Sequence, residues 1–251
     1  MKNPLQDKLS KSYFIENKKS KIFQININKA KEFYGRLIDS PFYNKERGLW
    51  NEEFSQRSGA NYFYSTDQLL GVIALASIGE NNKAKEFYCN IIDSPFYDRK
   101  EGLWGQFQGY KKLLLYPTRY STDQLLGVIA LASIGENNKA KEFYWNIIDS
   151  PFYDQEETNY WNHNDCQEPL DITRLLFSTD QLLGVIALAS IGENNKAKEF
   201  YERIVSSSLY DKEVKFFNHS MDENQKIIQI AKDTADQLFG VIALTICKNN
   251  K

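Results

Sequence analysis

The sequence has few cysteines and no excess of charge of either sign. Only 3 of its 251 residues are Cys, they are scattered, and none forms a CxxC pair; the net charge is −2. A disulfide framework is therefore not expected, and a reducing, cytoplasmic location is predicted. Since no block of Lys and Arg is interleaved with aromatic residues, we expect neither nucleic acid nor an anionic membrane surface as a partner.

Long apolar runs and known cofactor motifs are also missing. The longest apolar stretch, "LLGVIALASIG", is far shorter than the roughly 20 residues that a membrane-spanning helix needs. The first residues, "MKNPLQDKLSKSYFIENKKSK", contain no apolar segment of the kind found in secretory signals. The chain has no GxSxG, P-loop, GxGxxG or HExxH motif. We therefore predict no membrane span, no cofactor and no metal.

What the sequence does contain is a long internal repeat. The stretch "YSTDQLLGVIALASIGENNKAKEFY" runs from Tyr64 to Tyr88, recurs unchanged from Tyr120, and recurs from Ser178 without its first residue. An Asp-Gln pair marks each copy, and successive pairs are 56, 57 and 56 residues apart. A fixed period of this length indicates a repeat architecture, in which each copy is one supersecondary unit.

Each repeat predicts two helices. The segment "TDQLLGVIALASIG" is apolar on nearly every face and ends in Gly, which predicts a buried inner helix. The segment "NNKAKEFYxxII" carries one apolar stripe and ends before a Ser-Pro pair, which predicts an amphipathic outer helix. We expect an outer helix at 27–40, inner and outer pairs at 66–94, 122–150 and 179–207, and an inner helix at 235–247. Residues 1–26 are predicted to be an N-terminal extension, and 27–251 a single repeat domain.

The predicted fold is therefore all-α: four tandem helical hairpins that form a small α/α toroid or a curved array. The connections carry short alternating runs, such as "LWGQFQ", that predict small β-like arms at one pole. The first outer helix has no inner helix before it, and the last inner helix has no outer helix after it. Packing these two together would close a ring, which we favour. Alternatively, residues 5–16 form a decayed inner helix and the array stays open.

The polar residues that begin each inner helix allow two interpretations. The spacing from Ser65 to Gln68, repeated in every copy, is that of a capping box, in which Ser and Gln satisfy the helix's own N-terminal amides. This interpretation is favoured. Alternatively, parallel inner helices bring Asp67, Asp123, Asp180 and Asp236 to one mouth, where they form a shared polar site. The mid-helix glycines Gly71, Gly127, Gly184 and Gly240 are expected to let inner helices approach one another closely.

The arms contain the other candidate site residues. Trp50, Trp104 and Trp161 follow the turn of successive arms, and could either stack on sugar rings or pack the arm over the helix ends. His163 and His219 stand at matching places in the last two arms, and each could serve as a general acid or base or could be a solvated loop residue. A metal site at His163 with Asp165 and Cys166 is the least favoured alternative. Glu52 and Glu53 are the only paired carboxylates at the arm position.

These motifs resemble a known family. The pattern "DxxxGLW", a short arm and "YSTDQLLGVIALASIGENNKAKEFY" is similar to the repeating unit of α/α-toroid proteins, above all the N-acylglucosamine 2-epimerase-like branch. The resemblance covers about residues 27–247. It implies a toroidal fold, with sugars bound at the arm-bearing end and His residues acting as acid and base. The sequence departs from that family in having four units where six are usual, and no family motif surrounds its two His.

Two functional hypotheses follow. The first is a carbohydrate-binding or carbohydrate-modifying protein with its site at the arm pole; if it is an enzyme, it would be an isomerase, an epimerase or a glycoside hydrolase. In this hypothesis Trp50, Trp104 and Trp161 stack on the sugar, the four Asp contact its hydroxyls, and His163 or His219 transfers protons. The alternative is a non-catalytic helical-repeat scaffold that binds a protein or peptide. The sequence makes no prediction of oligomeric state.

Overall fold

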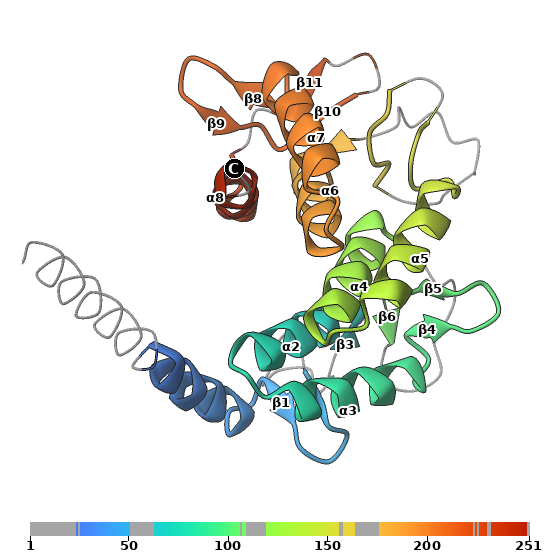
Figure 1. The fold of residues 1–251 in the computed structure, drawn as a ribbon, viewed down its shortest axis with the longest axis vertical. Helices are drawn as coiled ribbons and strands as arrows, with labels where there is room; N and C mark the ends of the chain where they lie inside the picture. The colour runs from blue at the N-terminus through green and yellow to red at the C-terminus, as the bar shows by residue number, and fades with distance from the viewer. Residues whose placement is uncertain are drawn as a thin grey trace, which may run out of the picture.

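The fold is a curved array of helical hairpins, as the repeat predicts. The computed structural model describes residues 24, 26–50, 63–105, 107–108, 119–155, 158–163, 176–222, 224, 226–229 and 232–249. Inner and outer helices alternate along the chain and follow a C-shaped path (Figure 1). The outer helices are that of residues 26–38, here called the first outer helix, α3 (Asn81–Ile92), α5 (Asn137–Ile148) and α7 (Asn194–Ser206). The inner helices are α2 (Ser65–Ser77), α4 (Ser121–Ser133), α6 (Ser178–Ser190) and α8 (Thr234–Asn249).

The inner helices form the core. Each packs beside the next, α2 on α4, α4 on α6 and α6 on α8. In α4 and α6 the apolar side chains are buried on every side, Leu125 and Leu182 completely. Burying one such side chain stabilises the fold by about 1.5–3 kcal/mol, which explains why these helices are uniformly apolar.

The outer helices bury one stripe and expose the rest, as their periodicity predicts. In α3 the buried residues are Ala84, Phe87, Tyr88 and Ile91. Inner and outer helices are joined by tight turns in which Gly79 has a φ of +81°, a conformation that favours glycine. At these turns an ion pair joins successive hairpins: Lys31–Glu80 at 2.7 Å, Lys85–Glu136 at 3.6 Å and Lys141–Glu193 at 3.9 Å.

The arms contain short β-ladders at the other pole, where the inner helices begin. Within an arm the strands pair as antiparallel hairpins, and in the third arm a single bridge joins Tyr153 and Trp161. Between arms, β3 pairs with β6 and β10 pairs with β7, while β11 pairs with β10 within the fourth arm. The hairpin pairs are β1 (Tyr43–Asn44) with β2 (Leu49–Trp50), β4 (Tyr97–Asp98) with β5 (Leu103–Trp104), and β8 (Tyr210–Asp211) with β9 (Phe216–Phe217). The remaining strands are β3 (Phe63–Tyr64), β6 (Phe107–Gln108), β7 (Leu176–Phe177), β10 (Ser220–Met221) and β11 (Ile227–Gln229).

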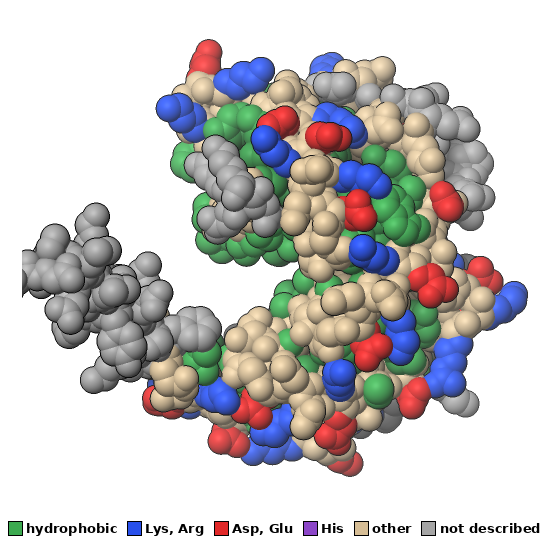
Figure 2. All heavy atoms as spheres, in the orientation of Figure 1, with side chains coloured by type: hydrophobic (Ala, Val, Ile, Leu, Met, Phe, Trp, Pro, Cys, Tyr) green, Lys and Arg blue, Asp and Glu red, His purple; other side chains and the backbone are tan. Residues whose placement is uncertain are grey.

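The ring is open, so the closure favoured from the sequence is wrong and the curved array is observed. Among the described residues α8 packs on α6 and α7, and it lies across an opening from the first outer helix (Figures 1 and 2). Four inner helices with this curvature turn through only part of a circle. Residues 5–16, the alternative inner helix, lie outside the described residues.

The mid-helix glycines have a packing role, but their partner differs from the one predicted. Gly71, Gly127 and Gly184 face an arm and an outer helix instead of the neighbouring inner helix, and Gly240 faces an arm. A Cβ added to Gly127 would lie 2.3 Å from Trp104 Nε1 and 2.9 Å from Phe143 Cε1. Gly71 and Gly184 meet Trp and Phe residues in the same way. The missing side chain therefore makes room for an indole ring that the arm lays across the helix.

Substituting Gly127 tests this packing. Gly127→Ala is expected to destabilise the fold by about 1–3 kcal/mol, because the methyl group overlaps Trp104 and Phe143. The matched control is Gly35→Ala in the first outer helix, where a Cβ has no neighbour within 4 Å. There Ala should stabilise the helix by about 0.5–1 kcal/mol. Chemical denaturation of both variants measures the difference, and equal effects would contradict the packing role.

Candidate functional site at the arm pole

The Gln of each Asp-Gln pair fixes an arm to its inner helix. Gln124 accepts a hydrogen bond from the backbone N–H of Trp104 at 2.9 Å and donates to the carbonyl of the same residue at 2.8 Å. Gln68, Gln181 and Gln237 make the same pair of bonds to Trp50, Trp161 and Phe217. Ser65 Oγ donates to Asp123 and Ser178 Oγ donates to the carbonyl of Asn218. The N–H groups of Ser121 and Ser178 donate to the carbonyls of His163 and His219 and not to a Gln, so the favoured capping-box interpretation is wrong. One primary amide instead satisfies both backbone groups of an arm residue.

In the second, third and fourth pairs, the Asp joins neighbouring inner helices. Thr66 Oγ1 donates to Asp123 at 2.5 Å, and Ser65 Oγ donates to the same carboxylate at 2.7 Å. Thr122 donates in the same way to Asp180, and Thr179 to Asp236 at 2.5 Å. The three accepting carboxylates are fully buried. We call this row the polar seam, formed by Thr66, Thr122, Thr179, Asp123, Asp180 and Asp236. The Asp residues thus line up at one pole, but between helices and not in an open mouth.

Burial raises the pKa of two carboxyl groups of the polar seam. Loss of solvent raises the pKa of Asp123 to about 6, although the hydrogen bonds from Thr66 and Ser65 oppose the rise. The neighbouring Asp180 carboxylate raises it further. Burial also raises the pKa of Asp236, against hydrogen bonds from Thr179 and His219. Asp123 Oδ2 is buried without a hydrogen-bond partner among the described residues, which fits a carboxyl that ionises reluctantly.

The raised pKa of Asp123 predicts a dependence of stability on pH. Below pH 3.8 folded and unfolded chains both hold the proton, and the stabilisation is complete; it is lost as pH rises through about 6. Compared with Asp123→Asn, which does not titrate, the wild-type protein should lose about 2 kcal/mol of unfolding free energy between pH 4 and pH 7. Urea unfolding of both proteins across this range measures the difference. A difference that does not change with pH would refute the pKa shift.

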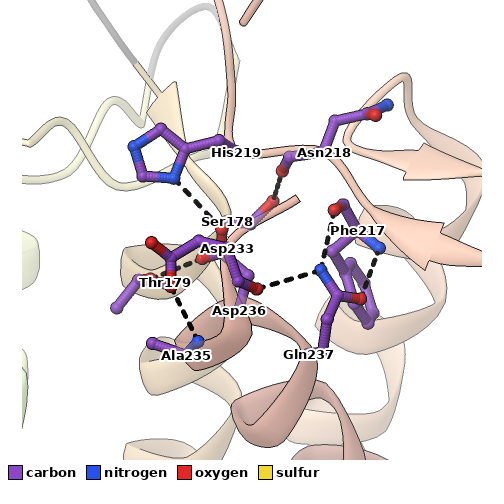
Figure 3. A network of polar contacts seen from close by, with 9 residues as sticks. All are labelled: Ser178, Thr179, Phe217, Asn218, His219, Asp233, Ala235, Asp236 and Gln237. Atoms are coloured by element: carbon purple, nitrogen blue, oxygen red, sulfur yellow. Dashed lines mark hydrogen bonds and ion pairs between the residues drawn. The ribbon is translucent and has the colours of Figure 1, made fainter. Parts of the chain in front are cut away.

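Two carboxylates of the polar seam hold the two histidines. His163 Nδ1 lies 2.9 Å from Asp180 Oδ2, and His219 Nδ1 lies 3.1 Å from Asp236 Oδ2 (Figure 3). An ionised carboxylate can only accept, so a neutral imidazole beside it carries its hydrogen on Nδ1 and its lone pair on Nε2. Figure 3 shows the second ring nitrogen of His219 turned away from Asp236. The side chains of His163 and His219 are 33% and 25% exposed, so solvent reaches both rings.

Aromatic contacts bring the two His–Asp pairs, here called dyads, into one row. The ring centroids are 4.7 Å apart between Tyr120 and His163, 4.3 Å between His163 and Phe177, and 5.0 Å between Phe177 and His219. The backbone of the third arm is also bonded to the start of α4, since the carbonyl of His163 accepts the N–H of Ser121 at 3.0 Å. The matching places of the two His in sequence therefore correspond to neighbouring places in space, one on each side of Phe177.

Of the remaining acidic candidates, the structure describes only Asp67. Asp67 begins the first inner helix and is half-buried. Glu52 and Glu53 lie outside the described residues, as does Gln106, the residue of the second arm that corresponds to His163. Asp165 and Cys166 are also outside them, so the metal alternative at His163 stays untested.

The tryptophans of the arms are covered by protein. Trp104 and Trp161 are fully buried, with Tyr97 and Tyr153 respectively 4.8 Å from them by ring centroids. Trp50 is half-buried, and Tyr43 packs against it at 4.9 Å. Of the two alternatives open from the sequence, these positions favour packing of the arm over the helix for Trp104 and Trp161. To stack on a sugar, either ring would have to move away from the mid-helix glycine on which it packs.

Sequence reasoning missed a groove on the outer side of the array. A cavity of about 900 Å³ lies between α3 and α5, lined among others by Cys89, Tyr88, Lys139 and Phe143. In the next outer helix the residue that corresponds to Cys89 is Trp145, and Lys196 Nζ lies 4.3 Å from its ring centroid. This position differs in every outer helix (Gly35, Cys89, Trp145 and Glu202), and that variation within an otherwise repeated segment is the signal that the sequence offered.

No helix within the described ranges combines the length and the apolar character needed to cross a membrane.

Comparisons with known proteins identify the fold. No family model matches the chain, and no curated protein matches it. Among solved structures, a D-mannose isomerase aligns with a TM-score of 0.63 and 12% identity, over 84% of this chain and 62% of its own. Cellobiose 2-epimerase from Bacillus thermoamylovorans aligns with a TM-score of 0.63 and 14% identity, over 91% of this chain and 68% of its own. The endo-β-1,4-glucanase CMCax from Acetobacter xylinum aligns with a TM-score of 0.60 and 10% identity, over 85% of this chain and 71% of its own.

These neighbours are α/α-toroid proteins, which confirms the fold inferred from the repeat. At 10–14% identity they show the fold alone. The chain spans about two thirds of their length, and its described residues contain four inner helices.

Proposed function

We propose that this chain, which has the fold of the α/α-toroid sugar isomerases and epimerases, binds a carbohydrate at the arm pole. We further propose that His163 and His219 transfer protons to and from the sugar. The observation that carries this proposal is the pair of His–Asp dyads on either side of Phe177. Two of the structural neighbours are a D-mannose isomerase and a cellobiose 2-epimerase, both of which act on sugars. The cytoplasmic location predicted from the cysteines remains part of this proposal.

The dyads suit an acid–base pair. Asp180 fixes the ring of His163 and selects the tautomer that leaves Nε2 with its lone pair, and Asp236 does the same for His219. One imidazole can then remove a proton while the other, protonated, returns one. Each carboxylate is itself held by a Thr of the preceding helix, so the rings are oriented by the scaffold and not by the substrate.

The same geometry favours isomerisation or epimerisation over glycoside hydrolysis. Hydrolysis of a glycosidic bond generally uses two carboxyl groups that flank the bond. Here Asp180 and Asp236 are fully buried and already bonded to Thr and His, so neither can reach a substrate. Isomerisation and 2-epimerisation of a reducing sugar require proton transfer at the carbon beside the carbonyl, for which neutral and protonated imidazole are suited. We therefore propose a reducing sugar as the substrate class.

Hydrogen exchange at the sugar tests the proposal. The protein is incubated in D2O with D-mannose, D-glucose or cellobiose, and deuterium at C2 is followed by NMR. We expect exchange with at least one sugar, reduced about 100-fold or more in His163→Asn and in His219→Asn. Asn can still donate to the Asp carboxylate, so the scaffold should hold while the titrating ring is lost.

The control is Val214→Ala, an exposed residue in the turn of the fourth arm, which should exchange like the wild-type protein. Melting temperatures with and without sugar report binding separately from chemistry. If no sugar shows exchange and none raises the melting temperature, the proposed function is wrong.

The groove between α3 and α5 supports a second candidate, a scaffold that binds a peptide with an aromatic side chain. The corresponding space between α5 and α7 holds Trp145 under the ammonium group of Lys196, and Lys139 lines the open groove. An aromatic side chain of a partner would occupy the place that Cys89 leaves vacant. A negative sugar screen would point to this function.

A further inference from the structure

The last inner helix exposes a face that the chain buries everywhere else. Leu238, Val241 and Ile242 of α8 are 60%, 63% and 45% exposed. The corresponding residues of α4, Leu125, Val128 and Ile129, are 0%, 0% and 8% exposed, and those of α6 are equally buried. In α2, α4 and α6 this face lies towards the next hairpin. Figure 2 shows hydrophobic side chains gathered where α8 borders the opening.

The first outer helix exposes the matching surface. Phe33 is 58% exposed, whereas its counterparts Phe87 and Phe200 are 9% and 5% exposed. Those counterparts pack on the mid-helix glycine of the inner helix before them, where a Cβ on Gly71 would meet Phe87 at 2.9 Å. Leu70 of α2 is also 43% exposed, whereas Leu126, its counterpart in α4, is 3% exposed.

The seat for such a Phe is present on α8. The three atoms nearest to a Cβ on Gly240 all belong to Phe217 of the arm, whereas at Gly127 the third belongs to Phe143 of the outer helix. Among the described residues, α8 therefore carries the glycine and the arm ring of a complete hairpin without its outer-helix Phe. Within the described residues, the first outer helix carries that Phe without an inner helix beneath it.

We propose that a second copy of this chain completes the terminal hairpin, head to tail. The first outer helix of the second copy packs on α8, with its Phe33 over Gly240, and α2 of the second copy covers Leu238, Val241 and Ile242. This contact repeats the packing that joins each inner helix to its outer helix and to the next hairpin within the chain. Within one chain the two surfaces lie on opposite sides of the opening (Figure 1).

The contact between copies lacks one feature of the contacts within the chain. Thr66, Thr122 and Thr179 each donate to an Asp of the next helix, but α8 has Ala235 at this position. The contact therefore depends on apolar burial without the buried hydrogen bond from this Thr. We expect it to dissociate on dilution, while the contacts within the chain remain intact.

Light scattering after size exclusion, over a range of protein concentrations, tests the association. The mass of one chain is 29.2 kDa. We expect the measured mass to rise above this value with concentration, and Phe33→Glu and Val241→Glu each to raise the dissociation constant about 10-fold or more. Both side chains are exposed in the single chain, so the variants should keep its melting temperature. The matched control is Val214→Glu, 51% exposed on an arm, which should associate normally.

Cross-linking between singly labelled chains tests the orientation. In a background of Cys89→Ser, Cys166→Ser and Cys247→Ser, one protein carries Phe33→Cys and another Val241→Cys. A short bis-maleimide should join the two proteins when they are mixed, and should join neither efficiently to itself. The proposal is overturned if the protein has the mass of one chain at every concentration. It is also overturned if Val241→Cys joins only to itself, or if a protein with both substitutions cross-links only within one chain.

Discussion

The structure depends on a hydrogen bond between neighbouring helices whose accepting carboxylate is fully buried. At each junction a Thr of one inner helix donates to the Asp of the next, and three such carboxylates are completely buried. A buried carboxylate is costly unless hydrogen bonds compensate for the water that it loses, so each Asp requires its neighbour in the correct register. Apolar burial is non-directional, so by itself it would leave the axial register between neighbouring inner helices weakly determined. The polar seam fixes the register of the array.

The candidate site follows from that seam. Because the Thr orients the carboxylate and the carboxylate orients the imidazole, His163 and His219 are held at the pole by the contacts that assemble the repeat. The Gln of each pair adds the arm, through both backbone groups of one residue. The proposed function therefore needs only small changes to this structural feature. The third and fourth arms have His163 and His219 at a position where the second arm has Gln106.

Periodicity was sufficient to predict the helices and their burial, because apolar spacing within one repeat reports directly on which face is covered. It was not sufficient to predict contacts between repeats. Ser65 and Gln68 have the spacing of a capping box, yet both side chains bond to other parts of the chain. Trp104 follows a turn, where exposure is expected, but Gly127 provides a buried seat for it. The matching places of the two His were visible in the sequence; their bonds to Asp180 and Asp236 depend on how one arm lies over two helices.

The most direct test of this account is a double-mutant cycle across one junction of the polar seam. Unfolding free energies are measured for the wild-type protein, Thr122→Val, Asp180→Asn and the double variant. A buried hydrogen bond to a carboxylate predicts a coupling of about 1–3 kcal/mol between the two sites. A coupling within about 0.3 kcal/mol of zero would mean that the two side chains act independently, and would contradict the claim that this bond sets the array.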